Sequence, residues 1–436
     1  MNQEQSGQAT APPTISDLTF ASFKIGCLSF GGPAAQIAMM HRVFVDEKKW
    51  IDEPRFLHAL NYCMLLPGPE AQQLATYVGW LLRGVKGGLI AGLLFVLPGA
   101  AVVLALSWLY LAHGSAPLVE AAFFGVRAAV VAFVIEALIR ISKRALKTRA
   151  DYWIAIASFA ALTLFAVPFP FIIIAAAIIG AFLIKRKAPA VDALTPIRQP
   201  SAAESMRAAA LWAFAWLAPL GASFAALGPD HVLSRVGALF AKLAVVTFGG
   251  AYAVLSYLRQ QAVEIEGWLS PQQMIDGLGL AETTPGPLVL VNQFVGYVAG
   301  WQVEGGGALS ALLAALMAAW MTFAPSFLWI FAGAPYAEGL RRNTRASAAL
   351  AAITAAVLGV IANLAFWFAA HVLFRESGAV SLPWGARLDL PALASFDIGA
   401  SLICAATAFA LIRLHADAIF VVLASAVAGV ALNALV

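Results

Sequence analysis

The chain has 436 residues, of which 61% are hydrophobic and 11% charged, with 27 Lys and Arg against 23 Asp and Glu. Its mean hydropathy is +0.84, and apolar stretches run from residue 20 to 435, which excludes a soluble domain of useful size. The basic excess does not indicate nucleic-acid binding, because Lys and Arg fall in short loops between apolar stretches, as in the positive-inside bias of membrane proteins.

Residues 1–16 contain no Lys or Arg and no apolar core of a signal peptide, so the first helix is expected to direct insertion. Cys27, Cys63 and Cys404 lie within apolar stretches and match neither a disulfide framework nor a zinc site, so we interpret them as packing residues. The histidines lack ligand spacing. We therefore expect no metal and no cofactor.

Apolar stretches near or above the roughly 20 residues of a membrane span fill the first half. They cover residues 20–39, 56–82, 88–112, 119–141 and 152–184. Pro67-Gly68-Pro69 interrupts the second of these stretches, and Pro168 and Pro170 interrupt the last. Helix breakers inside a membrane segment are tolerated only where protein or a wet cavity satisfies the freed backbone groups, so the breaks suggest a site.

A polar, proline-rich linker over residues 185–207 is the expected boundary between two halves. Residues 1–17 precede the first half as a polar segment, the first repeat covers 18–184, and the second covers 208–436. Apolar stretches of the second half cover residues 211–227, 236–258, 274–301, 309–331, 346–374, 396–411 and 418–435, and the stretch at 274–301 is a broken pair.

The two halves repeat one another at a single offset in residue number, since 248 − 30 = 218 and the other matches give the same difference. The matching features are Phe30-Gly31-Gly32 with Phe248-Gly249-Gly250, Trp50 with Trp268, Pro67-Gly68-Pro69 with Pro285-Gly286-Pro287, Lys24 with Lys242, and Arg127 with Arg345. Three motifs and two charges in one register indicate an internal duplication.

The basic residues of the first half share one face if the Pro67-Gly68-Pro69 segment re-enters from its own side. They are Arg42, Lys48, Lys49, Arg55, Arg83, Lys86, Lys143, Arg144, Lys147 and Arg149. The positive-inside rule makes this face cytoplasmic and gives the second half the opposite direction. We predict an all-α polytopic membrane protein of two inverted-topology repeats with broken or re-entrant helices. How often 152–184 and 208–228 cross is left open.

Phe30-Gly31-Gly32-Pro33, Pro67-Gly68-Pro69 with Gln72-Gln73, Pro98-Gly99 and the second-half copies resemble the two-domain chromate ion transporters over residues 18–435. The resemblance implies an inner-membrane protein that exports chromate and confers resistance, with sulfate as the related oxyanion. The second half departs from this motif pattern. It has Ala251 where the first half has Pro33, and residues 288–290 where the first half has 70–72, so whether the two halves have equal roles is left open.

Glycines at 31 and 32, and at 249 and 250, let backbone amides approach an anion, and Pro33 suits the first position of a new half-helix. Such an N-terminus carries about half a positive charge and free N–H groups, which suits a tetrahedral oxyanion. Pro69 starts a similar run, in which Gln72 and Gln73 offer neutral donors that Asn292 matches in the second half. The alternative is that the glycines serve close helix packing.

Lys24 and Lys242 lie within their apolar stretches, where a central charge is costly, so they are expected either to face a polar cavity or to snorkel to the interface. Glu70 and Glu282 flank the two Pro-Gly-Pro breaks. Either acid is a candidate for binding a coupling proton, and capping a half-helix is the alternative.

A secondary transporter for a small oxyanion is the leading hypothesis, because the P-loop of a primary pump is absent. A membrane-embedded enzyme would need a cluster of His and Asp that the sequence lacks, whereas a channel of the same architecture stays open. The expected partners are chromate or sulfate and the lipid bilayer of the cell inner membrane, with no nucleic acid; a homodimer is left open. The inside-negative potential favours export of a dianion.

Overall fold

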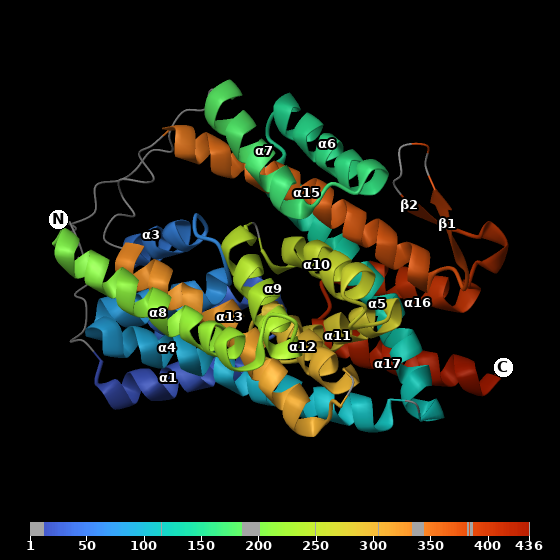
Figure 1. Ribbon diagram of the computed structural model, residues 1–436, viewed down its shortest axis with the longest axis horizontal. Coiled ribbons are helices and arrows are strands. Elements are labelled where there is room, and N and C mark those ends of the chain that lie inside the picture. Colours follow the sequence, from blue (N-terminus) through green and yellow to red (C-terminus); the bar gives the residue numbers. More distant parts are fainter. Residues whose placement is uncertain are drawn as a thin grey trace, which may run out of the picture.

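The computed structural model describes residues 13–114, 116–184, 201–248, 250–303, 305–333, 344–381, 383 and 387–435, and these are almost wholly helical (Figure 1). The first half contains α1 (Ile15–Leu28), α2 (Gly32–His41), a π-helical turn (Arg42–Glu47), α3 (Glu53–Cys63), α4 (Glu70–His113), α5 (Pro117–Ala145), α6 (Arg149–Phe165) and α7 (Phe169–Leu183). Of the expected linker, 185–200 lie outside the described residues, and 202–207 form the start of the next helix.

The second half begins with α8 (Ala202–Leu227), which has no counterpart before α1 among the described residues. It continues with α9 (Val232–Val246), α10 (Ala251–Arg259), a π-helical turn (Gln260–Ile265), α11 (Pro271–Thr283), a 3-10 turn (Leu288–Leu290), α12 (Val291–Gln302), α13 (Ala308–Gly333), α15 (Thr344–Val372), β1 (Ser377–Ser381), β2 (Arg387–Pro391), a 3-10 turn (Leu393–Ser395), α16 (Ile398–Ile412) and α17 (Ala418–Leu435).

Local structure recurs in the two halves at the offset seen in the sequence. The series α1, α2, π-helical turn and α3 returns in the second half as α9, α10, π-helical turn and α11, and the two π-helical turns begin at Arg42 and Gln260 (260 − 42 = 218). The agreement extends to an unusual element, because π-helical turns are rare in proteins. Inversion of the second copy relative to the membrane stays a prediction.

Two apolar stretches that the sequence analysis treated as continuous are divided. Residues 20–39 are split between α1 and α2, and 236–258 between α9 and α10, in each case at the Gly-Gly motif. Conversely, 56–82 and 88–112 are linked, because α4 continues from Glu70 to His113 through a kink at Arg83 and Gly84, where φ is −143° and 60°.

The last helices of each half pack on the other half. α15 lies against α6 and α7, whereas α5 lies against α16 and α17, so each long helix is held by a helical pair from the opposite half (Figure 1). Small residues allow this contact: a Cβ on Gly125 of α5 would stand 1.8 Å from the carbonyl oxygen of Ser425, and Gly429 lies against the carbonyl of Ala121. Such close backbone approach is the usual basis of helix packing in membranes.

Prolines inside α8 and α13 join these two helices. Pro325 has no N–H, so the carbonyl of Met321 four residues earlier loses its helical partner. The Nε1–H of Trp216 donates to this carbonyl at 3.2 Å. In return Trp320 donates to the carbonyl four residues before Pro219, at 3.1 Å. Each indole therefore satisfies the backbone group that the other helix's proline has freed.

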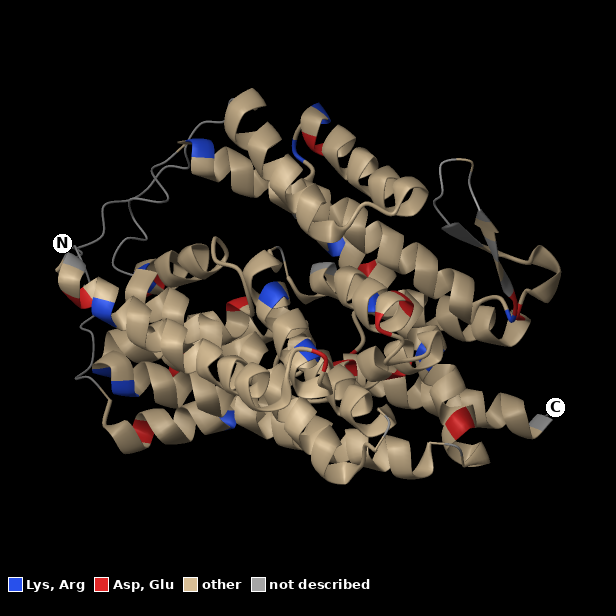
Figure 2. Cartoon of the chain, viewed as in Figure 1, with Lys and Arg blue, Asp and Glu red and all other residues tan. Residues whose placement is uncertain are grey.

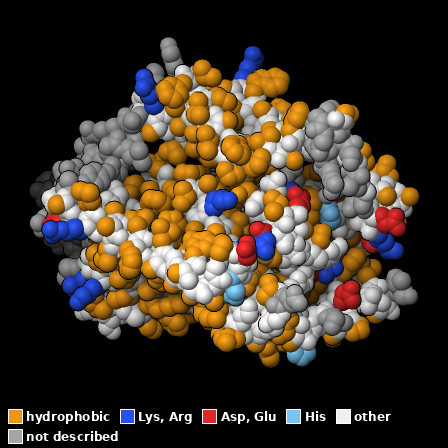
Figure 3. All heavy atoms as spheres, viewed as in Figure 1, with side chains coloured by type: hydrophobic (Ala, Val, Ile, Leu, Met, Phe, Trp, Pro, Cys, Tyr) orange, Lys and Arg blue, Asp and Glu red, His pale blue; other side chains and the backbone are white. Residues whose placement is uncertain are grey.

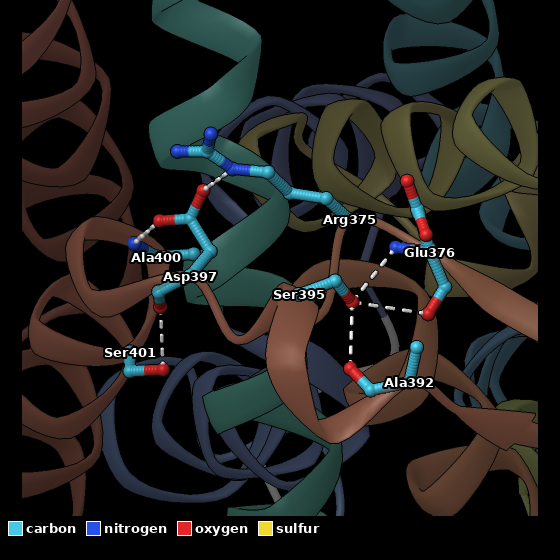
Figure 4. A network of polar contacts seen from close by, with 7 residues as sticks. All are labelled: Arg375, Glu376, Ala392, Ser395, Asp397, Ala400 and Ser401. Atoms are coloured by element: carbon cyan, nitrogen blue, oxygen red, sulfur yellow. Dashed lines mark hydrogen bonds and ion pairs between the residues drawn. The ribbon is translucent and has the colours of Figure 1, made fainter.

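A two-stranded antiparallel sheet of β1 and β2 occupies the polar gap before α16, where the sequence analysis expected no strand. Figure 4 shows how its base is fixed: the Asp397 carboxylate accepts from Arg375 and from the N–H of Ala400, both at 2.9 Å, and Ser395 Oγ bridges Glu376 and Ala392. Partial burial opposes the ionisation of Asp397, but these donors outweigh it and hold the pKa of this carboxyl below its usual range.

The surface agrees with a membrane environment. Among the described residues, five helices are long and apolar enough to cross a bilayer: Glu70–His113, Pro117–Lys143, Ala203–Leu227, Ala308–Gly333 and Thr344–Val372. The long helices carry few charged residues over most of their length (Figure 2), and hydrophobic side chains cover much of the face shown in Figure 3. The chain is thus an all-α polytopic membrane protein.

We expect Gly125→Ala to lower the free energy of unfolding by about 1–3 kcal/mol, because the added methyl group overpacks the contact between α5 and α17. Thermal unfolding in detergent measures this. Gly221→Ala in α8 is the matched control: its Cβ meets nothing within 4 Å, so the variant should match or slightly exceed the parent. Equal midpoints for the two variants would contradict the packing argument.

Candidate functional site

Two backbone hydrogen bonds tie the halves together at their breaks. The N–H of Gly68 donates to the carbonyl of Thr247 at 2.9 Å, and the N–H of Gly286 donates to the carbonyl of Ser29 at 2.8 Å. The donors and the acceptors are related by the repeat offset (286 − 68 and 247 − 29 both give 218), so one contact repeats the other with the halves exchanged. Ser29 and Thr247 end α1 and α9. Each Pro-Gly-Pro loop therefore closes a helix of the opposite half.

A small cavity lies at this junction, where four helical segments begin. Its lining residues are Pro33, Gln36, Gly68, Pro69, Glu70, Ala71, Gly250, Ala251, Pro287, Leu288 and Val289. They come from the starts of α2, α4 and α10 and from the 3-10 turn that leads into α12. The helix starts bring unpaired N–H groups and partial positive charge to one place.

Backbone conformation explains the glycines at the breaks. Gly31, Gly32, Gly68, Gly250 and Gly286 all have positive φ, between 78° and 113°, a region that residues with a side chain rarely adopt. A Cβ on Gly32 or Gly250 would meet nothing within 4 Å. At these two positions the alternative of close helix packing is therefore wrong, and the turn into the half-helix requires glycine. Gly249 lies outside the described residues.

The polar side chains of the cavity come from one half. Gln36 and Glu70 belong to the first repeat, and their positions in the second repeat hold Val254 and Leu288. Gln36 is only 1% exposed, and its Nε2 donates to the carbonyl of Gly286 at 2.6 Å. Sequence reasoning missed Gln36. The available signal was a lone polar residue three positions after Pro33, near the start of the half-helix.

Three other expected donors are buried but directed away from the cavity. Gln72 donates to the carbonyl of Phe323 at 3.2 Å, and Asn292 donates to Thr322 at 3.1 Å, both on α13. Gln73 donates to the carbonyl of Pro67 at 2.7 Å and so braces its own loop. Pro67 and Pro285 shape their loops without lining the cavity, whereas Pro33, Pro69 and Pro287 line it.

The structure does not bring Lys24 and Lys242 to this cavity. Both side chains are exposed, on α1 and α9, and neither residue lines the cavity. Their repetition at the common offset therefore reflects the outward face of two equivalent helices, and exposure matches the snorkelling interpretation. None of the described cavity-lining residues is Lys or Arg.

The two acids near the breaks differ in their surroundings. Glu70 is the first residue of α4 and lines the cavity. Glu282 lies inside α11, 5% exposed, and accepts a hydrogen bond from the hydroxyl of Tyr252 on α10. Its position in the first repeat holds Met64, so the pair formed by Glu282 and Tyr252 belongs to the second repeat alone.

A buried ion pair that the sequence analysis did not anticipate links the halves. Arg127 of α5 makes a bidentate contact with Asp276 of α11, at 2.7 and 2.9 Å, and the hydroxyl of Tyr110 on α4 donates to the same carboxylate at 2.8 Å. Asp276 is completely buried and Arg127 is 22% exposed. Arg127 had been noted for its repeat partner, but its own partner lies 149 residues away. A lone Asp in an apolar segment was the available signal.

The arrangement is suited to binding an anion. Among the described residues, no group of three or more His, Cys, Asp or Glu could hold a metal ion. Buried backbone N–H groups at helix starts recognise anions through hydrogen bonds and the helix dipole. The cavity volume is about 20 Å³, room for about one water molecule.

Comparison with known proteins agrees with this geometry. The family model described as "Chromate transporter" matches residues 16–181 and 234–430, one segment in each half. The chain belongs to the chromate transporter family. The transporter is 36% identical to the chromate transport protein of Pseudomonas aeruginosa over 360 residues, which cover 81% of each chain.

Two further relatives extend the similarity. The transporter is 30% identical over 378 residues, 86% of each chain, to the chromate transport protein of Cupriavidus metallidurans. It is also 30% identical over 367 residues to the probable chromate transport protein of Synechococcus elongatus, which covers 84% of this chain and 86% of the relative. No solved structure matches the transporter.

We expect Asp276→Asn to lower the free energy of unfolding by about 3 kcal/mol, because it leaves the largely buried Arg127 without its carboxylate. Thermal unfolding in detergent is the measurement. Asp52→Asn is the matched control, since the pair between Asp52 and Arg55 is half exposed and Asn also caps a helix. A double variant, Arg127→Met with Asp276→Leu, should recover most of the loss; no recovery would contradict the ion-pair explanation.

Proposed function

We propose that the protein is a secondary transporter that exports chromate across the cell inner membrane. The observation that carries the proposal is the convergence of four helix starts on one small cavity, two from each repeat. The chromate transport proteins named above, alike over most of their length, support chromate as the substrate. A permease or channel for sulfate or another small anion is the alternative with the same architecture.

Backbone groups would supply most of the recognition. Each helix N-terminus presents up to four N–H groups without helical partners and about half a positive charge. A tetrahedral oxyanion offers acceptors in four directions, which suits donors that arrive from several helices. Because none of the described residues that line the cavity is Lys or Arg, the anion would not be held there by a full positive charge, and its release on the far side would cost less.

Movement at the junction would give alternating access. A cavity of about 20 Å³ does not hold an anion of five heavy atoms, so the helix starts have to separate for binding. The contacts of Gly68 with Thr247 and of Gly286 with Ser29 span the two repeats at this point. We propose that these two contacts break and re-form in alternation as one repeat rocks against the other.

Inverted repeats would place the basic loops of both halves in the cytoplasm. The exposed residues Lys143, Lys147 and Arg149 lie from the last turn of α5 to the start of α6, and Arg345 lies in the first turn of α15. Arg341 and Arg342, which precede Arg345 in the same basic segment, lie outside the described residues. The positive-inside rule puts both loops on one side of the membrane.

Single cysteines at Lys147 and Arg342 should both react with a membrane-impermeant maleimide only when it is applied from the cytoplasmic side. A cysteine at Ala116, in the loop between α4 and α5, is the control and should react from outside. The background replaces Cys27, because Cys63 and Cys404 are buried. Labelling of positions 147 and 342 from opposite sides would contradict the inverted arrangement.

The membrane potential supplies a driving force for export. Each negative charge that leaves an inside-negative compartment gains about 2.3 kcal/mol per 100 mV, so a dianion gains twice that amount. Uptake would have to overcome the same energy by co-transport of cations. Proton exchange through Glu70 or Glu282 is the competing mechanism, because both acids lie beside the breaks.

We expect chromate efflux from loaded proteoliposomes to accelerate when a potassium-valinomycin gradient makes the interior negative at equal pH on both sides. Gly68→Val should abolish the flux, because its φ of 113° excludes a branched side chain, and Gly221→Ala should leave it unchanged. Efflux that ignored voltage but followed a pH gradient would favour proton exchange. Flux of sulfate without chromate would support the alternative permease.

A further inference from the structure

Three buried hydrogen-bond donors lie behind the first Pro-Gly-Pro loop. They are the hydroxyl groups of Tyr77 on α4 and Ser326 on α13 and the indole N–H of Trp329 on α13. Tyr77 and Ser326 are 0% and 1% exposed, and none of the three donors has a hydrogen-bond partner in the part of the chain that the structure describes. Buried donors without acceptors are rare, because each has given up its hydrogen bonds to water, so three in one region point to a ligand that brings acceptors.

Ser326 forms the level closest to the loop. A Cβ added to Gly68 would stand 2.9 Å from Nε2 of Gln73 and 3.9 Å from Oγ of Ser326, so the loop, the start of α4 and the middle of α13 meet at this hydroxyl. Ser326 therefore lies next to the junction, although it is not among the residues that line the cavity.

Tyr77 and Trp329 form a second level, one helical turn further from the loop. Tyr77 follows Gln73 by four residues on α4, and Trp329 follows Ser326 by three residues on α13. Tyr62 of α3 connects the two: its hydroxyl donates to the backbone carbonyl of Trp329 at 3.2 Å, and its ring centroid is 5.7 Å from that of Tyr77. The three donors therefore follow the seam where α3, α4 and α13 meet.

The second repeat is tightly packed at the equivalent place. Pro98 and Pro325 correspond (325 − 98 = 227), so Gly99 takes the position of Ser326. A Cβ on Gly99 would stand 2.1 Å from the carbonyl oxygen of Pro285, which means that backbone packs directly on backbone there. The loop of the first repeat faces an unpaired hydroxyl instead, so the two sides of the junction differ in packing and in polarity.

The chemistry of the three donors suits an oxyanion. The Nε1–H of Trp329 donates and cannot accept, so a metal cation does not satisfy it, whereas the hydroxyls of Tyr77 and Ser326 can turn their hydrogens toward the same acceptor. Hydrogen bonds to an anion are roughly twice as strong as those between neutral groups. The buried Oε1 of Gln73 has no partner among the described residues and needs a donor, which a water molecule carried in with the anion supplies.

We infer that Tyr77, Ser326 and Trp329 form an entry site, which binds the oxyanion between α3, α4 and α13 before it reaches the junction cavity. This inference rests on the proposed function and adds a site outside the cavity, since none of the three residues is among those that line it. α4 packs against both α3 and α13, so the site opens as these helices separate, in the movement that widens the junction.

The direction of α4 gives the side from which the anion enters. Beyond Tyr77 the helix leads to its kink at Arg83, and Arg83 and Lys86 are exposed basic residues. The positive-inside rule assigns them to the cytoplasmic face. The entry site therefore lies between the cytoplasm and the cavity, where an exporter first meets its substrate.

Chromate uptake into inverted membrane vesicles tests the site, because these vesicles present the cytoplasmic face to the medium. Tyr77→Phe and Ser326→Ala each remove one hydroxyl with little change in shape. Each variant should need about tenfold more chromate for half-maximal flux, the scale of one hydrogen bond to a charged group, and should keep the maximal flux. Tyr152→Phe on α6 is the matched control, since Tyr152 is 53% exposed, and should behave as the parent.

Thermal unfolding in detergent separates recognition from a structural role. Without chromate, Tyr77→Phe and Ser326→Ala should unfold at or above the midpoint of the parent, because each loses a buried polar group that had no partner. Chromate at the concentration for half-maximal flux of the parent should raise the midpoint of the parent and raise those of the two variants less, because a ligand stabilises according to its occupancy.

Three results would overturn the inference. An unchanged half-maximal concentration in both variants would mean that these hydroxyls do not touch the anion. Lower midpoints of the variants without chromate would show that the hydroxyls serve the packing of the protein. An equal rise in the half-maximal concentration in right-side-out vesicles would contradict entry from the cytoplasm. In all three cases chromate flux through the parent, and with it the proposed function, stands; absence of that flux would contradict the proposed function itself.

Discussion

Backbone groups freed at the helix breaks have to find partners inside the protein, because lipid offers no hydrogen bonds. Here the partners lie in the opposite repeat: Gly68 serves the end of α9, and Gly286 serves the end of α1. Each half would leave buried polar groups unsatisfied without the other. The cavity, the half-helices that open onto it and the glycines with positive φ all follow from this exchange of hydrogen bonds.

Prolines elsewhere in the fold also free backbone carbonyls that find partners inside the protein. The carbonyls freed by Pro219 and Pro325 receive indole N–H groups from the neighbouring helix, so the two helix breakers become two points of attachment. Pro98 is handled differently. The carbonyl of Leu94 is freed, and Gly26 of α1 lies so close to it that a Cβ would stand 2.1 Å away. Each of these prolines therefore frees a carbonyl that a particular neighbouring helix contacts.

Helix breaks could be predicted from the sequence, because they depend on local chemistry. Pro67-Gly68-Pro69 and Gly31-Gly32-Pro33 cannot continue an α-helix, and their repetition located the junction correctly. Direction around a helix could not be predicted from a uniformly apolar stretch. Lys24 therefore looked like a cavity residue but is exposed, and Gln36, on an equally featureless stretch, went unnoticed although it lines the cavity.

Contacts between the halves were beyond the sequence for a related reason. The partner of Asp276 lies 149 residues away, and the partner of Glu282 lies on another helix, so no spacing rule connects them. Helix packing in an apolar chain depends on small residues such as Gly125 and Gly429, which resemble many other glycines until their neighbours are known. Local sequence patterns were enough to predict the helices, but which helices pack against one another could be seen only in the three-dimensional structure.

The exchange of helical pairs between the halves constrains how the chain is made. α5 ends at Ala145, but its neighbours α16 and α17 are synthesised after all the other helices described here. The first half is therefore inserted with the contact surface of α5 uncovered, and its cover arrives only after synthesis has passed Ile398, where α16 begins. A chain stopped before α16 would expose that surface to the bilayer, so the contact surface of α5 is covered only once α16 and α17 have been inserted.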